Sequence, residues 1–387
     1  DQLEDPYEAI EAYNQILMVD PDNATAMQNL ERLYRSLEQW FDLVDVLQQH
    51  IDVVEEVDRK VELLDDLARV QQNQVDEPYA AIEAFERSLE LDADQPSALF
   101  NLAGLHERTG NWQSAVDAYE RLLERVDDEA DRIDVHFTVG QLLEQELNND
   151  VDAEQHYEDA LALDPQHEPV REALELLLER NSDWEGLIDL YTSSAEETRD
   201  LTEKAQYLAR AGTVYEDELD DWRSALDFYE QALEEDPKEL EAAEPLIDLY
   251  LEQDEWERAV PLLDMAIAKY KELPDIEPGQ LEDRYVQLAR VYEGREQDGE
   301  AIEQYWNAYD IDRHDVDVLL GLSRLLFEDE QYNDAARLFE QIEEEHAAAL
   351  ETDELVDLYF RAGRTQQEFG ALEQAIDYYD AAVELDG

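Results

Sequence analysis

Side chains suited to catalysis or metal binding are few and scattered in this sequence. The seven histidines are not spaced as two ligands on one helix would be, and no H-E-x-x-H motif occurs. Glu343 and His346 form one Glu-x-x-His pair, whereas a helical di-iron site needs two such pairs and two further glutamates. The chain has no cysteine, so thiolate ligands and thiol nucleophiles are excluded. We predict neither a metal site nor a cofactor.

The sequence also lacks the motifs of common enzyme classes. It contains no glycine-rich phosphate loop, no nucleophile elbow and no kinase signature. The acidic segment from Asp127 to Asp131 lacks the glycine and the spacing of an EF-hand loop, and a solvated linker explains it better. We therefore predict that the chain is not an enzyme.

The charge of the chain restricts its partners. There are 28 Lys and Arg against 104 Asp and Glu, which gives a net charge of −76. Nucleic acids and anionic membranes are bound through clustered cations, so neither is expected as a partner. No apolar run approaches the length of a membrane span. Three explanations stay open: a basic partner, a bound cation such as calcium, and adaptation to high salt. The scarcity of lysine favours the last.

One small and two larger residues recur together along the whole chain. The first set is Ala9, Tyr13 and Ile16, with Pro21 following, at offsets of 0, 4, 7 and 12. Offsets of 4 and 7 place side chains on one stripe of a helix, and proline ends the helix. Sets at the same offsets begin at Ala81, Ala153, Ala225, Ala301 and Ala375, and weaker ones at Leu43, Ala115, Leu187, Ala259 and Ala335.

The distance from one set to the next alternates, at first between 34 and 38 residues, so that every second set begins 72 residues after the one before it. The last four distances are 34, 42, 34 and 40 residues. A tryptophan stands three residues before four of the weaker sets, and we expect these side chains to be packing anchors largely buried between helices: Trp40, Trp112, Trp184 and Trp256. A second apolar stripe at offsets 0, 3, 4 and 7 precedes each set and predicts a partner helix, as in Leu99, Leu102, Ala103 and His106.

A helix pair of about 34 residues, with a large–Leu–small pattern in its first helix and Ala–aromatic–Ala in its second, resembles the tetratricopeptide repeat family. The resemblance covers essentially the whole chain. It implies an all-α fold, a right-handed solenoid of antiparallel helix pairs with alternating 34- and 38-residue units. Residues 1–387 are then one superhelical array of about ten full repeats and a leading half repeat.

Both ends of the predicted array are helices without a polar outer face, around Pro6 to Met18 and Glu373 to Leu385. Repeat stacks need such caps, so we expect a fragment of a longer protein or ends covered by a partner. Residue 1 is Asp, so a missing signal peptide says little about the compartment, for which the cytoplasm is the default expectation. The oligomeric state stays open.

The resemblance implies that the first helix of each repeat faces a concave groove. In the last three repeats, the first helix carries an apolar residue on this side and an arginine four residues later. The two rows together suit a peptide or helix with apolar anchors and acidic character. The alternative is that each arginine pairs with an aspartate seven residues earlier or on the next repeat. The candidate groove residues are Val286, Leu320, Phe360, Arg290, Arg324, Arg364 and Phe327, with Phe100 and Phe137 in the amino-terminal half.

The absence of a catalytic constellation and the repeat pattern favour a scaffold or adaptor that binds other proteins through a peptide or helix. The alternative is a regulatory or sensor array of a larger protein whose catalytic domain lies outside this sequence. The identity of the partner does not follow from the sequence.

Overall fold

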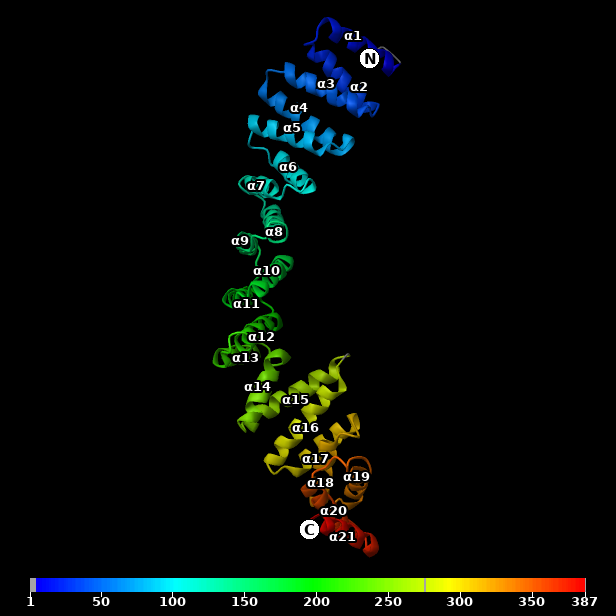
Figure 1. The fold of residues 1–387 in the computed structure, drawn as a ribbon. Helices are drawn as coiled ribbons and strands as arrows, with labels where there is room; N and C mark the ends of the chain where they lie inside the picture. The colour runs from blue at the N-terminus through cyan, green and yellow to red at the C-terminus, as the bar shows by residue number, and fades with distance from the viewer. Residues whose placement is uncertain (1–4, 275, 387) are drawn as a thin grey trace. The chain divides into compact units, whose positions relative to one another are not determined.

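The computed structural model describes residues 5–274 and 276–386, and Figure 1 shows the helices in this part of the chain. The chain divides into two compact units, residues 1–183 and 184–387. Helices and turns account for the described residues, and no strand occurs among them. None of the helices described combines the length and apolar character needed to cross a membrane. The all-α prediction is confirmed.

The first unit stacks its helices in chain order, each packed on the next. A short π-helical turn, Gln71–Val75, continues α4. The helices are α1 (Pro6–Val19), α2 (Ala24–Ser36), α3 (Trp40–Val53), α4 (Val57–Val70), α5 (Pro78–Leu91), α6 (Pro96–Arg108), α7 (Trp112–Leu123), α8 (Glu129–Gln145), α9 (Asp150–Leu163) and α10 (Glu168–Asn181).

The second unit follows the same principle. Its helices are α11 (Trp184–Glu197), α12 (Leu201–Asp217), α13 (Trp222–Glu235), α14 (Leu240–Glu252), α15 (Trp256–Glu272), α16 (Pro278–Gly294), α17 (Asp298–Ile311), α18 (Val316–Glu328), α19 (Tyr332–Glu345), α20 (Thr352–Glu368) and α21 (Leu372–Asp386). The predicted terminal helices are thus present as α1 and α21, while residue 387, where the predicted array ends, lies outside the described residues.

The turn inside each predicted pair contains one residue with left-handed backbone geometry, which reverses the chain within a few residues. Gly110 and Gly370 occupy two of these turns, with φ of 73° and 76°. The others hold residues that have a side chain and a φ between 51° and 62°: Glu38, Asp76, Asn148, Ser182, Asp220, Asp254, Glu296 and Glu330. A left-handed residue therefore marks each turn five residues before the first residue of the set in the predicted second helix.

The repeated small and aromatic positions form the core. Ala153, Tyr157 and Ala160 are fully buried on α9. The Tyr157 hydroxyl donates to Glu144 Oε2 on α8 at 2.8 Å, so the buried ring keeps a hydrogen-bond partner. Tyr229 repeats the arrangement with Glu216 at 2.6 Å. These bonds join the two helices of a pair at the site that the sequence pattern marks.

The four predicted anchor tryptophans are partly buried. They are Trp40, Trp112, Trp184 and Trp256. Each begins its helix. Trp256 packs so closely on α16 that a Cβ on Gly294 would lie 2.5 Å from the indole Cη2.

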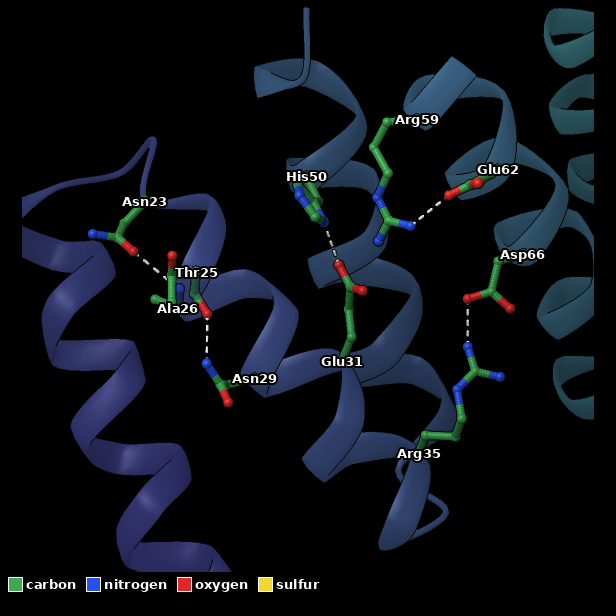
Figure 2. A network of polar contacts seen from close by, with 10 residues as sticks. All are labelled: Asn23, Thr25, Ala26, Asn29, Glu31, Arg35, His50, Arg59, Glu62 and Asp66. Atoms are coloured by element: carbon green, nitrogen blue, oxygen red, sulfur yellow. Dashed lines mark hydrogen bonds and ion pairs between the residues drawn. The ribbon is translucent and has the colours of Figure 1, made fainter. Parts of the chain in front are cut away.

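Polar contacts join α2, α3 and α4 beside the apolar core (Figure 2). His50, which is 2% exposed, contacts Glu31 Oε1 through Nδ1 at 2.5 Å. Burial raises the pKa of Glu31, and His50 opposes this shift. Arg35 of α2 pairs with Asp66 of α4. These contacts satisfy polar groups that packing brings together.

Candidate functional site

Three apolar residues occupy equivalent positions on α16, α18 and α20. They are Val286, Leu320 and Phe360. Each stands one residue after a position whose side chain packs toward the neighbouring helix. Ion pairs described below link α16 to α18 and α18 to α20, so the three residues belong to one surface. We call it the α16–α20 face and define it by Val286, Leu320 and Phe360.

Each of these three residues lines a different hollow. Val286 borders a hollow of about 370 Å³, Leu320 one of about 250 Å³, and Phe360 one of about 450 Å³. The Phe360 side chain is 50% exposed, whereas Val286 and Leu320 are half-buried. The face therefore presents one apolar side chain beside a hollow on each of α16, α18 and α20.

The arginine row lies on the same face, and two of its members have acidic partners. Arg290 Nη2 lies 2.8 Å from Asp317 Oδ2 on α18. Arg324 pairs with Glu293 on α16, and its Nη1 lies 3.9 Å from Glu328 Oε2. Arg290 thus contacts an aspartate of the next repeat, as the alternative describes. Arg324 instead contacts a glutamate of the preceding repeat and one of its own helix. In neither case is the aspartate seven residues earlier the partner.

Arg364 differs from the other two. It is exposed on α20 and makes no ion pair with any residue that the structure describes. Its neighbour Arg361 is engaged instead: Nη1 lies 2.9 Å from Glu328 Oε1 and Nε lies 2.7 Å from Asp357 Oδ2. Arg361 was not among the predicted residues, because only the contacts between repeats distinguish it from Arg364.

The predicted aromatic candidates fall into two kinds. Phe327 packs on Tyr332 and Phe339, with ring centroids 5.8 and 6.4 Å apart, and Arg361 lies over its face. Phe137, in the first unit, is likewise half-buried against neighbouring rings. Phe100 is 57% exposed and occupies, in the first unit, the position equivalent to Val286.

The hollow beside Val286 has a strongly acidic lining. Glu282 is buried there, and its Oε1 accepts no hydrogen bond from the described residues. Burial raises the pKa of Glu282 to about 7, and the nearby carboxylates of Asp315, Asp312 and Asp283 add to the shift. Glu282 was not among the predicted residues, although alignment by the 34-residue spacing places it at the position of the apolar Val316.

A histidine pair in the first unit was also missed. His136 on α8 and His156 on α9 stand 20 residues apart, yet their Nδ1 atoms lie 3.1 Å from each other. Burial lowers the pKa of both imidazoles, and for His136 the proximity of His156 lowers it further. Helix pairing brings them together, which spacing within one helix does not reveal.

Within the described part of the chain, no three acidic or histidine side chains gather closely enough to hold a metal ion. The hollows of the α16–α20 face are lined by charged and apolar side chains, an arrangement suited to binding.

Comparison with known families gives a consistent result. Four models described as tetratricopeptide repeat match residues 26–61, 94–166, 218–277 and 356–387, which together make up just over half of the chain. No curated protein sequence matches the chain significantly.

Several solved structures resemble the chain at low identity. YrrB, described as a repeat protein with an unusual peptide-binding site, is 18% identical over 50% of this chain and 91% of its own, with a TM-score of 0.38. PilF of Pseudomonas aeruginosa is 16% identical over 65% of this chain and 90% of its own, with a TM-score of 0.32. The complex of Naa15 and Naa10 with HypK is 12% identical over 98% and 68%, with a TM-score of 0.39. These similarities carry no information about the ligand of this chain.

Proposed function

We propose, from the premise that this chain is built of tetratricopeptide repeats, that it is an interaction scaffold which binds a peptide or helix of a partner protein on the α16–α20 face. Such repeats generally hold other proteins and do not catalyse reactions. The partner segment lies across successive repeats and places apolar side chains against Val286, Leu320 and Phe360.

One observation carries this proposal: the three equivalent apolar residues of successive repeats each border their own hollow. A solvent-facing apolar row amid dense carboxylates is costly unless it is covered. A bound helix presents anchors at i, i+3, i+4 and i+7, and an extended segment presents alternate side chains, so either form can fill hollows placed in a row.

The arginines support an acidic ligand less well than the sequence suggested. Arg290 and Arg324 already contact carboxylates. An acidic peptide would have to displace those partners, and among the three predicted arginines only Arg364 stands without an ion pair to the described residues. Apolar docking is therefore the main interaction, and the charge preference of the ligand is argued separately below.

The test is capture of partners from an extract of the source organism, with a photo-crosslinking amino acid at position 320. The double variant Val286→Asp with Phe360→Asp should lose the captured protein, because it puts charge into two of the hollows. Phe100→Asp, at the equivalent exposed position of the first unit, is the matched control and should retain it. Retention by the double variant with an unchanged melting temperature would exclude the α16–α20 face.

A further inference from the structure

Glu282 is a buried acid, and one of its two carboxylate oxygens has no partner. The residue is 9% exposed, and its Oε1 has no hydrogen-bond partner among the described residues. An ionised carboxylate taken out of water is unfavourable unless it is hydrogen-bonded or paired with a cation. The site is therefore incomplete as it stands.

The surroundings do not supply the missing cation. Arg284, which lines the same hollow, pairs with Glu244 and lies 3.2 Å from Asp248. Arg290, on the other side, pairs with Asp317. Both cations of the hollow thus have acidic partners of their own.

Two further carboxylates face Glu282. Asp315 Oδ1 accepts the backbone N–H of Val318 at 2.8 Å, which caps α18 but leaves the negative charge in place. Asp283 lines the hollow as well, and neither aspartate makes an ion pair with a described residue. Together these three acids create a strongly negative potential inside a hollow of about 370 Å³.

Helix packing does not explain the choice of a carboxylate here. The equivalent positions of the next two repeats are Val316 and Val356, so the same stripe accepts a smaller apolar side chain. Glutamate at this position raises the cost of folding, and its Oε1 has no hydrogen bond to a described residue to offset that cost. Groups retained at such a cost are typical of binding sites.

We propose that this hollow is the recognition pocket for one basic side chain, arginine or lysine, of the partner segment bound on the α16–α20 face, with Glu282 as its buried acceptor. The proposal rests on the proposed function and adds the ligand's chemistry. Asp283 and Asp315 flank the bound cation, and Val286 contacts its aliphatic stem. A metal ion fits less well, since no suitable ligand group occurs among the described residues.

Binding of the cation should couple to a proton. Burial, followed by the charges of Asp315, Asp312 and Asp283, raises the pKa of Glu282 to about 7, so the carboxyl is partly protonated at neutral pH. A guanidinium or ammonium against it favours the ionised form and lowers that pKa. Occupation of the pocket at pH 7 should therefore release protons.

The probe is N-acetyl-arginine amide, and its neutral isostere N-acetyl-citrulline amide serves as the ligand control. Binding is followed on the full chain by NMR of 13C-labelled tyrosine, because Tyr270 lines the hollow, in molar KCl to suppress general attraction to the acidic surface. We expect a saturable shift of the Tyr270 signal with the arginine probe and none with citrulline.

Glu282→Gln should weaken that binding by roughly tenfold or more, since the buried ionic partner is lost. Glu303→Gln, an exposed position on α17, is the matched control and should leave it unchanged. Equal shifts with both probes, or equal affinity in the Glu282→Gln protein, would overturn the pocket. Glu282→Val places the residue type of the neighbouring repeats at this position and should also lose the binding. It provides a second test in case Glu282→Gln does not fold.

Failure of this inference is distinguishable from failure of the proposed function. If Glu282→Gln retains the captured partner while Val286→Asp with Phe360→Asp loses it, the face binds a partner but the pocket does not select a basic side chain. If the double variant retains the partner, the proposed function fails whatever the arginine probe does.

Discussion

The ring of Tyr157 on α9 lies directly against Gly140 on α8, so that a Cβ on this glycine would stand 2.4 Å from Tyr157 Cε1. Gly212 and Tyr229 repeat the relationship at 2.6 Å. Real Cβ atoms do not approach a ring so closely, and a fully buried tyrosine has little room to move. Glycine at these positions allows the two helices of a pair to pack around the aromatic ring.

We therefore predict that Gly140→Ala destabilises the protein although alanine is the better helix former. Overpacking of a buried contact costs about 1–3 kcal/mol, which exceeds the gain of about 0.5–1 kcal/mol from helix propensity. The free energy of unfolding from urea titration measures the difference, and the hydrogen bond from Tyr157 to Glu144 should be disturbed as well.

Gly104→Ala is the matched control. Gly104 lies within α6, and no atom lies within 4 Å of a Cβ built there, so this substitution should stabilise the chain by about 0.5–1 kcal/mol. If both variants are stabilised, Tyr157 moves aside freely and the close contact imposes no constraint.

The contact between buried His136 and half-buried His156 predicts a loss of stability in mild acid. Burial lowers the pKa of both imidazoles below the unfolded value. Asp159 opposes this shift in both, and Glu120 also opposes it in His156. Arg132 adds to the lowering of the pKa of His136. The unfolded chain therefore binds more protons, and the free energy of unfolding falls as the pH drops through about 6.5. The loss ends below the folded pKa values.

His136→Gln with His156→Gln should flatten this pH dependence between about pH 7 and 5, measured by thermal melts across the range. His314→Gln is the control, since His314 is exposed and Glu345 raises its pKa. His314 therefore contributes stability that is present in acid and lost as the pH rises. Its removal should not flatten the fall in melting temperature between about pH 7 and 5. An unchanged profile in the double variant would contradict the prediction.

The backbone of this chain follows from the sequence, because the small and aromatic residues at offsets of 4 and 7 can be buried in only one way by a helix pair. The Ala153 and Tyr157 positions, predicted from spacing alone, are fully buried. The tryptophans show the limit of this argument, because the spacing predicts that they pack between helices but does not say how much of each indole stays exposed.

Side-chain partners could not be predicted in the same way. Arg290 pairs with Asp317 of the next repeat, although Asp283 lies nearer along its own helix. Exposed ion pairs differ in free energy by less than about 1 kcal/mol, so geometry between repeats selects among them. The contact between His136 and His156 likewise depends on how α8 and α9 pack, and the sequence spacing gives no sign of it.

The net charge of −76 predicts that salt stabilises the folded chain. Folding brings the carboxylates closer together, and the Debye length falls from about 10 Å at 0.1 M salt to about 3 Å at 1 M, which screens their repulsion. The melting temperature should rise between these NaCl concentrations, and KCl should give the same rise because screening does not depend on the cation. A flat response would remove adaptation to high salt as the explanation and favour a basic partner.

Arg324 and Arg364 occupy equivalent positions but differ in their contacts. This difference allows a structural role of the arginine row to be distinguished from a role in binding the partner. Arg324 pairs with Glu293 and lies near Glu328, whereas Arg364 makes no ion pair with a described residue. Arg324→Ala should lower the free energy of unfolding by up to about 1 kcal/mol, because its side chain is 37% exposed and solvent screens the pair. Arg364→Ala should leave stability unchanged.

The double variant should then melt like Arg324→Ala alone, because Arg364 contributes no pair to lose. Partner capture is measured on the same three proteins. Binding lost in Arg364→Ala at an unchanged melting temperature would assign this arginine to the ligand and restore an acidic group in the partner segment. Binding retained in all three variants, with stability lost only where Arg324 is removed, means that the arginine row joins neighbouring repeats. The partner then docks through Val286, Leu320 and Phe360.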